Sequence, residues 1–248
     1  MKKTFLILLI LLVSSCKKAN KKELDAQQII DKTIEVSGGI HYKNSTVSFD
    51  FRDIHYISDQ IDGKKLLKRI TTTDSLVITD IKAHNSFQRF FNDSLLILSD
   101  SISNRYANSV NSVHYFARLP YGLNDSAVNK ELIGEVMING NNYYKIKVTF
   151  NQNDGGEDFD DVYIYWVNKI TLKPDFLAYE FHVDGGGIRF REAYNERYIN
   201  KIRFVDYKNY KANNKVVDIF EIDSLFNTES LELLSKIELK NIRVEALN

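Results

Sequence analysis

Hydrophobic residues recur at helical spacing in two long segments of the chain and in one short segment. Residues 26–37 carry one apolar face, and Asp25 and Gln28 are placed to form a capping box at its start. Residues 102–118 repeat apolar side chains every three or four positions, which predicts a second helix. Leucines within an acidic stretch predict a short third helix over 224–235.

Most of the remaining chain alternates between apolar and polar residues, which is the period of β-strands. The clearest hairpin spans residues 131–150, where Asn139-Gly140 forms a strong tight-turn pair. The alternation changes phase at Arg52-Asp53, which predicts a β-bulge there. Further strands are predicted over residues 64–72, 75–82, 86–91, 94–99, 161–168, 175–183, 188–194, 198–210, 215–222 and 237–245.

The connections between these strands are short, so neighbouring strands should be antiparallel. The predicted fold class is therefore mainly β (α+β). We expect a single large curved antiparallel sheet, or half-barrel, of about ten or eleven strands. Two or three helices should cover its concave face.

Two predicted strands carry apolar residues on both faces. Residues 162–167 show almost no polar alternation, and residues 176–179 are similar. A sheet with one solvated face alternates cleanly, so something must cover the second face. The helices could complete an ordinary core, or the sheet and helices could enclose an incompletely filled cavity. Candidates for lining such a cavity are Phe49, Phe51, Ile164, Trp166, Phe176 and Phe181.

The first sixteen residues have the pattern of a bacterial export signal. Two lysines precede an unbroken apolar segment from Phe5 to Val13, whereas a membrane-spanning helix needs roughly 20 residues. The sequence Leu-Val-Ser-Ser-Cys, ending at Cys16, resembles the lipobox of bacterial lipoproteins. That resemblance implies cleavage before Cys16 and lipid, such as palmitate, on the new N-terminal cysteine. The alternative is an ordinary signal peptide in which Cys16 merely falls near the cleavage point.

Cys16 is the only cysteine in the chain, which favours the lipoprotein interpretation. We expect a signal peptide over 1–15, a lipidated tether over 16–22 and a single domain over 23–248. The lipid would anchor the protein in the cell envelope. Lys17 and Lys18 follow the cysteine, and by resemblance to known sorting rules this favours the outer membrane.

Charge and cysteine content exclude several kinds of partner and of stabilisation. The whole chain has 33 basic and 33 acidic residues, and this balance gives no electrostatic reason to expect nucleic acid as a partner. With its one cysteine lipidated, the domain can form no internal disulfide. Burial of a hydrophobic core must therefore hold it together.

Three segments resemble an uncharacterised family of Bacteroidota lipoproteins within the LolA/LolB-like superfamily of outer-membrane lipoprotein-sorting proteins. They are residues 157–163, 185–195 and 203–207. The order of a lipobox, an opening helix that ends in Gly-Gly, strands, a second helix and more strands is also similar. The resemblance covers about residues 23–248 and implies a half-barrel that shelters lipid or lipoprotein acyl chains. These motifs have no assigned chemistry to carry over.

Candidate chemical sites are weak. His182, Asp184 and Glu192 could form a catalytic patch, although a glycine-rich hairpin with polar residues explains them better. The acidic residues of 154–161 could bind calcium, but their spacing does not fit an EF-hand, and a solvated hairpin tip is the better account. The five histidines lack zinc-binding spacing. We therefore predict no catalytic residue, no metal and no cofactor.

The favoured hypothesis is an outer-membrane-anchored, non-enzymatic lipoprotein that binds lipid or acyl chains in an apolar cavity. The alternative is an envelope scaffold with a filled core that binds a protein or a glycan. A hydrolase using His182, Asp184 and Glu192 is a distant third. An open apolar cavity of several hundred Å³ would distinguish the first hypothesis from the second.

Overall fold

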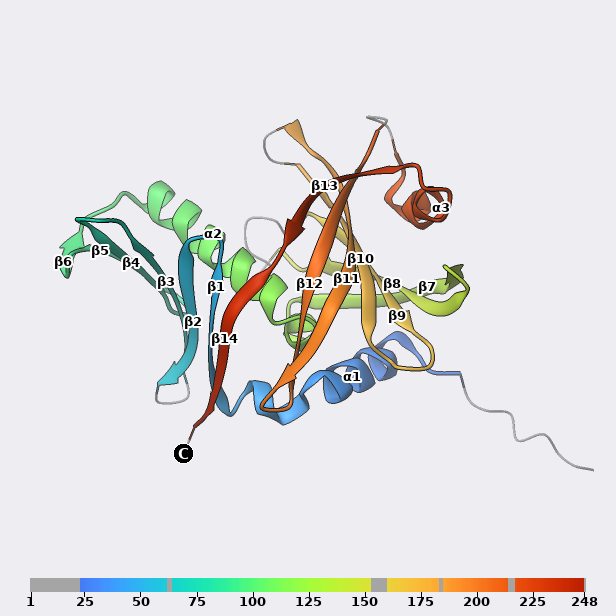
Figure 1. The fold of residues 1–248 in the computed structure, drawn as a ribbon, viewed down its shortest axis with the longest axis horizontal. Helices are drawn as coiled ribbons and strands as arrows, with labels where there is room; N and C mark the ends of the chain where they lie inside the picture. Colours follow the sequence, from blue (N-terminus) through green and yellow to red (C-terminus); the bar gives the residue numbers. More distant parts are fainter. Residues whose placement is uncertain (1–22, 62–63, 153–159, 183–184, 214–216, 248) are drawn as a thin grey trace, which may run out of the picture.

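The computed structural model describes residues 23–61, 64–152, 160–182, 185–213 and 217–247. These residues form two seven-stranded antiparallel sheets and three α-helices (Figure 1). The strand order is β14-β1-β2-β3-β4-β5-β6 in sheet A and β13-β12-β11-β10-β9-β8-β7 in sheet B. The mainly β, antiparallel fold class is confirmed. Its strands are divided between two sheets, where the sequence had suggested ten or eleven strands in one.

The elements have the following bounds. Sheet A comprises β1 (Ser45–Phe51), β2 (Ile54–Ile61), β3 (Lys64–Thr72), β4 (Val77–Lys82), β5 (Phe87–Phe91), β6 (Ser94–Leu96) and β14 (Leu239–Ala246). Sheet B comprises β7 (Val128–Ile138), β8 (Asn141–Phe150), β9 (Val162–Asn168), β10 (Pro174–Phe181), β11 (Gly187–Ile199), β12 (Ile202–Ala212) and β13 (Leu231–Ile237). The helices are α1 (Ala26–Ser37), α2 (Asp100–Ala117) and α3 (Ile222–Asn227), with short 3-10 turns η1 (Gly39–Tyr42), η2 (Tyr121–Asn124) and η4 (Ile219–Glu221).

The first two predicted helices are confirmed, and the capping box of α1 is present. The Asp25 carboxylate accepts the Gln28 backbone N–H at 2.8 Å, and the Gln28 side chain accepts the Asp25 N–H at 3.2 Å. The third helix is shorter than predicted, because residues 231–237 pair with β12 as a strand. The strand predicted over 215–222 is wrong in its described part, since Ile219 to Ile222 lie in η4 and the start of α3, and its first two residues lie outside the described residues. No helix in the described part of the chain combines the length and apolarity needed to cross a membrane.

The change of phase at Arg52-Asp53 is a tight turn, so the predicted β-bulge is wrong. Phe51 pairs directly with Ile54, and Arg52 has a positive φ of 55°. A two-residue hairpin turn reverses the chain and restarts the alternation on the return strand. The predicted Asn139-Gly140 hairpin turn is confirmed, with both residues at positive φ between β7 and β8.

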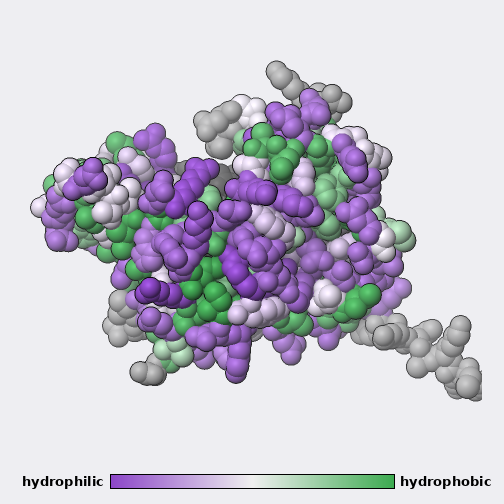
Figure 2. Space-filling model, viewed as in Figure 1, coloured by the Kyte–Doolittle hydropathy of each residue, from purple (hydrophilic) through white to green (hydrophobic). Residues whose placement is uncertain are grey.

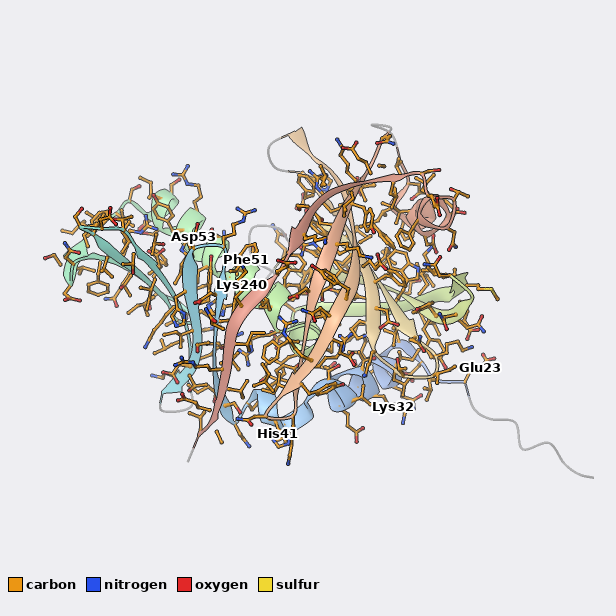
Figure 3. The ribbon with its side chains drawn as sticks, in the orientation of Figure 1. Glu23, Lys32, His41, Phe51, Asp53 and Lys240 are labelled. Atoms are coloured by element: carbon orange, nitrogen blue, oxygen red, sulfur yellow. The ribbon has the colours of Figure 1, made fainter. Side chains whose placement is uncertain are left out.

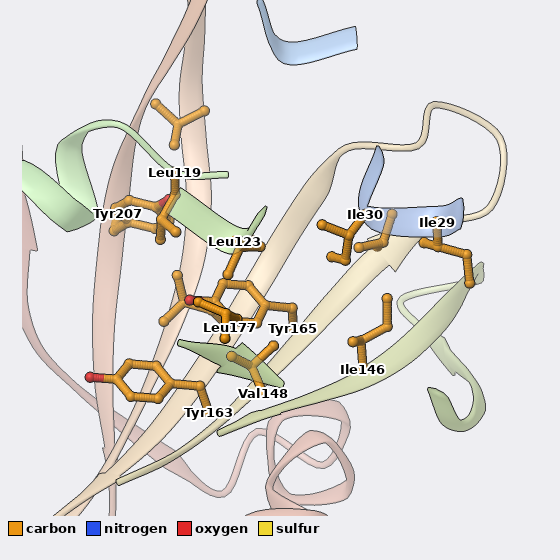
Figure 4. Close-up of a cluster of buried hydrophobic side chains, with 13 residues drawn as sticks. Ile29, Ile30, Leu119, Leu123, Ile146, Val148, Tyr163, Tyr165, Leu177 and Tyr207 are labelled. Atoms are coloured by element: carbon orange, nitrogen blue, oxygen red, sulfur yellow. The ribbon is translucent and has the colours of Figure 1, made fainter. Parts of the chain in front are cut away.

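Sheet B is covered on both faces, which explains the two-sided apolar strands. On one face, Ile29 and Ile30 of α1 pack with Ile146 and Tyr165 (Figure 4). On the other face, η4 and α3 cover a second cluster that includes Trp166. Both faces of β9 are therefore buried, and six of its seven residues are buried.

A buried ion pair holds α3 on sheet B. The Lys145 ammonium group lies 3.0 Å from the carboxylate of Asp223, and the Trp166 indole N–H donates to the same carboxylate at 3.1 Å. Lys145 also donates to the backbone carbonyl of Phe220 in η4. Because each polar group of this cluster is bonded to another, the segment can sit on an apolar sheet without leaving a charge unpaired.

Sheet A contacts α2 through a row of charges. Arg69, Asp80 and Arg89 are cross-strand neighbours on β3, β4 and β5. Asp80 is 1% exposed and accepts hydrogen bonds from both guanidinium groups. Arg89 also stacks on Tyr106 of α2, with its Cζ 3.4 Å from the ring centre. The charge pairs lie within sheet A, and they position Arg89 for its cation–π contact with Tyr106 and Arg69 for a hydrogen bond to Ser109 of α2.

The two sheets are joined where β13 leads into β14. Phe51 at the end of β1 pairs with Leu239, and Figure 3 shows Phe51 beside Lys240 at this junction. The Asp206 carboxylate, 3% exposed, accepts the Leu239 backbone N–H at 2.9 Å and pairs with Arg197. Figure 2 shows a mostly hydrophilic face, with hydrophobic side chains gathered where β14 faces β12.

Replacing Lys145 by Met should lower the free energy of unfolding by about 3–5 kcal/mol, because Asp223 would be left as an unpaired buried charge. Adding Asp223→Asn should recover more than half of that loss, since the amide oxygen can still accept from Trp166. Urea unfolding followed by circular dichroism measures both changes. The matched control is Lys211→Met, which breaks the exposed pair with Glu232 and should cost no more than about 1 kcal/mol. Equal losses in the two single variants would contradict this account.

Candidate functional site

An apolar cavity of about 430 Å³ lies on the inner face of sheet B, between the sheet and the last turns of α2. The sheet contributes Tyr163, Tyr179 and Val205, and α2 contributes Val113 and Phe116. Alternation along each strand explains this choice of residues, because every second side chain points to the same face. The cavity is open to solvent on one side and has the size of a small ligand pocket.

The junction of the two sheets closes one end of the cavity. Ile237 and Leu239 line it from either side of the crossing between β13 and β14, and Phe51 lines it from the end of β1. The wall at this end therefore comes from both sheets. Its shape depends on the crossing that Asp206 fixes.

Two arginines and one aspartate interrupt the apolar lining. Arg189 and Arg191 of β11 face the cavity, and so does Asp161, which is buried just before β9. Asp161 makes interactions of its own within the protein. Arg191 is 8% exposed, donates to the Tyr179 hydroxyl at 3.0 Å and stacks over Phe116 with its Cζ 4.0 Å from the ring centre.

A second, larger cleft of about 1100 Å³ lies on the opposite side of α2, bounded by this helix, by sheet A and by the segment from η2 to the start of β7. Its lining includes Lys65, Lys82 and Arg118, together with Asp125. Burial lowers the pKa of the Lys82 ammonium group and also the pKa of Arg118. The Arg118 guanidinium is fixed by the Tyr42 carbonyl at 2.9 Å and by the Ser58 hydroxyl. Basic side chains are therefore more numerous in this cleft than in the apolar cavity, and buried cations suit an anionic group better than an acyl chain.

A buried histidine of α2 borders the second cleft. His114 is 2% exposed, and its Nε2 lies 3.0 Å from the Lys68 carbonyl oxygen, to which a neutral ring can donate. Its ring packs edge-on against Phe49 and Tyr56. Burial lowers the pKa of His114 to about 3. The ring is therefore neutral near pH 7 and acts as part of the core.

The six residues predicted to line a cavity are divided among three places. Phe51 and Phe181 line the apolar cavity. Phe49 is fully buried in sheet A, where it stacks on Tyr56. The other three lie on the outer face of sheet B beneath α3, one residue out of phase with the cavity, and are Ile164, Trp166 and Phe176.

The residues of the hydrolase hypothesis are not brought together among the described parts of the chain. His182 is exposed at the end of β10, and Asp184 lies outside the described residues. Glu192 pairs in register with Phe176, six residues before His182, a separation of about 20 Å along the strand. The Glu192 carboxylate accepts hydrogen bonds from Lys208 and from Tyr210 at 3.0 Å.

Part of the predicted acidic loop also lies outside the described residues, namely Asp154, Glu157 and Asp158. Asp160 is exposed, and Asp161 faces the apolar cavity. Over the described ranges, no three His, Cys, Asp or Glu side chains gather in a way that could hold a metal ion.

The sequence prediction missed Arg189 and Arg191. They lie in residues 185–195, one of the segments that carried the family resemblance, and alternate with Ile188 and Phe190. The sequence pattern that could have identified them is a pair of arginines two positions apart, which places both side chains on the same face of a strand. Whether that face holds solvent or a cavity depends on the placement of α2, which strand alternation does not reveal.

Residues 2–239 match a family described as "Family of unknown function (DUF6503)", and no curated protein matches the chain. A LolA superfamily protein from Nitrosomonas europaea is similar in structure, with a TM-score of 0.51 and 12% identity over 91% of this chain and 96% of that one. A DUF1329 family protein from Desulfovibrio piger has a TM-score of 0.50 and 11% identity over 89% and 93%. This likeness concerns the fold, and it confirms the predicted LolA-like architecture.

The lowered pKa of His114 predicts a pH-dependent stability. Between about pH 6.5 and about pH 3, the unfolded chain binds a proton at this position that the folded chain does not. The free energy of unfolding should therefore fall as the pH drops through this window, by at most about 1.4 kcal/mol per pH unit. His114→Phe should remove this contribution, whereas the exposed His84→Phe should keep it. Urea unfolding at neutral pH and near pH 4 compares the three chains, and an unchanged pH dependence in His114→Phe would contradict the prediction.

Proposed function

The chain belongs to the DUF6503 family, whose function is unknown, and we propose that it is a non-enzymatic lipoprotein of the cell envelope that binds lipid in its apolar cavity. The observation that carries this proposal is the cavity of about 430 Å³ on the inner face of sheet B. Its aromatic and aliphatic walls can remove an acyl chain from water. Burial of apolar surface gains about 25 cal/mol per Å², part of which is offset by the cost of association.

The LolA-like fold supports this proposal by analogy. A protein of the LolA superfamily has the same arrangement over almost its whole length. The proposed ligand is a lipid, or the acyl chain of a lipoprotein. The scaffold alternative, with a filled core, suits the outer face of sheet B, where α3 seals the apolar cluster, but it leaves the cavity unexplained.

The export signal and Cys16 support the envelope location. In this proposal, residues 1–15 are removed, Cys16 carries the lipid, and residues 16–22 tether a single domain that begins near residue 23. The lysines after Cys16 favour attachment to the outer membrane. The resemblance to Bacteroidota lipoproteins favours a bacterium of that group as the source. Two or more acyl chains anchor a protein stably where a single chain is marginal. A protein attached in this way would act as an acceptor or a sensor of lipid.

Lipid binding is tested by displacement of a fluorescent fatty-acid analogue from the chain that begins at residue 16, with Cys16→Ser so that no anchor competes. We expect saturable binding, and a loss of affinity of about tenfold or more in Val113→Phe, because the larger ring takes up space that the ligand would occupy. The control is Ile170→Phe in the exposed β9–β10 turn, which should bind as the wild type does. Circular dichroism and urea unfolding verify that each variant is folded. The absence of binding in the wild type, or equal affinity in Val113→Phe, would contradict the proposal.

Lipidation is tested separately by growing cells that express the whole chain with radiolabelled palmitate. We expect label in the membrane-bound protein and no label in Cys16→Ser, because the sulfur is the attachment atom. Cys16→Ser should also keep the uncleaved signal peptide. Ser15→Ala, which leaves a small residue before the cut, serves as the control and should be labelled normally. Label in Cys16→Ser would show that the anchor lies elsewhere.

A further inference from the structure

A buried cation, Arg191, lies in the wall of the apolar cavity. Arg191 is 8% exposed, and its Nε has no hydrogen-bond partner among the described residues. Within the same residues, no carboxylate lies within ion-pairing distance of its guanidinium group, which donates to the Tyr179 hydroxyl at 3.0 Å. Burying a charge in this way is costly unless an anion pairs with it.

Aromatic rings hold the Arg191 guanidinium in place. Its Cζ lies 4.0 Å from the centre of the Phe116 ring and 5.0 Å from that of Tyr179. These cation–π contacts offset part of the desolvation, but they leave hydrogen-bond donors unused. Arg189 lies two residues nearer the β10–β11 hairpin on the same face, and its Cζ is 4.9 Å from the Phe181 ring centre. The two arginines therefore place positive charge on the β11 side of the cavity, which Asp161 also lines.

The size of the cavity limits the number of acyl chains. A volume of about 430 Å³ lies toward the small end of the range of ligand pockets, and the space is bounded by sheet B on one side and by α2 on the other. This matches one acyl chain of moderate length. A lipid with two or three chains would leave most of its apolar surface outside the cavity.

From these observations we propose that the cavity binds a single-chain fatty acid, and that Arg191 pairs with its carboxylate while the tail lies against Phe116, Val113 and Val205. This inference rests on the proposed function and adds the class of ligand to it. Two arginines and one aspartate line the site, and this balance suits an anion of single charge. A planar carboxylate also fits the fork of a guanidinium group. Arg189, nearer the hairpin, strengthens the positive potential on the same side.

The test compares dodecanoate with dodecanol, which has the same chain and no charge. Each displaces a fluorescent apolar probe from the chain beginning at residue 16, with Cys16→Ser. We expect the wild type to bind dodecanoate about tenfold or more tightly than dodecanol, because only dodecanoate can accept a charge-assisted hydrogen bond from Arg191 through a carboxylate. In Arg191→Met the preference should vanish while dodecanol still binds. Arg191→Lys keeps the charge and should retain part of the preference.

Arg105→Met is the matched control, since Arg105 is exposed on α2 and should leave the preference unchanged. Equal binding of dodecanoate and dodecanol by the wild type, or a preference that survives in Arg191→Met, would overturn the role of Arg191 and leave the proposed function standing. If neither compound binds, the proposed function fails as well. Phosphatidylglycerol with two twelve-carbon chains should displace the probe poorly, and displacement as strong as that by dodecanoate would overturn the single-chain assignment. Urea unfolding of Arg191→Met confirms that lost preference is not lost fold.

Discussion

The chain passes from sheet B to sheet A with a single residue between β13 and β14, and the buried carboxylate of Asp206 holds this crossing. It accepts the Leu239 backbone N–H and pairs with Arg197, which in turn donates to the Leu239 carbonyl oxygen. The two sheets are thereby fixed at one point. Because Ile237, Leu239 and Phe51 line the end of the cavity, its shape follows from the angle at which the sheets meet there.

The helix α2 has a different role at each end. Its first half lies on the charged row of Arg69, Asp80 and Arg89, and its second half enters the apolar core of sheet B through Tyr115 and Phe116. This change along one helix explains the contrast between the two hollows beside it. Val113 and Phe116 face an apolar cavity, whereas the opposite side of the helix faces a basic cleft. The helix therefore separates two environments with different ligand chemistry.

Local patterns in the sequence predicted what local physics determines. The capping box of α1, the helix over 100–117 and the turn at Asn139-Gly140 depend on neighbouring residues, and all three are confirmed. The errors concern choices made by distant contacts. Residues 231–237 became a strand because β12 offers an unpaired edge, and Trp166 faces α3 because strand parity alone does not say which face holds a cavity. Arg191 was missed for the same reason, since its burial depends on Phe116 of α2, 75 positions earlier in the chain.

The burial of both faces of β9 has a consequence for how this family can vary. Six of its seven residues are buried, so almost any exchange there disturbs one of two cores. Across related proteins, the amino-acid sequence of β9 should vary least among the strands. Its conservation would reflect the packing of two cores and not the recognition of a ligand. The cavity draws its lining from both sheets and from α2, so a single exchange at its wall can alter which ligand fits while the fold persists. Evolutionary change of specificity is therefore expected at the wall positions of α2 and β11, and slow change at β9.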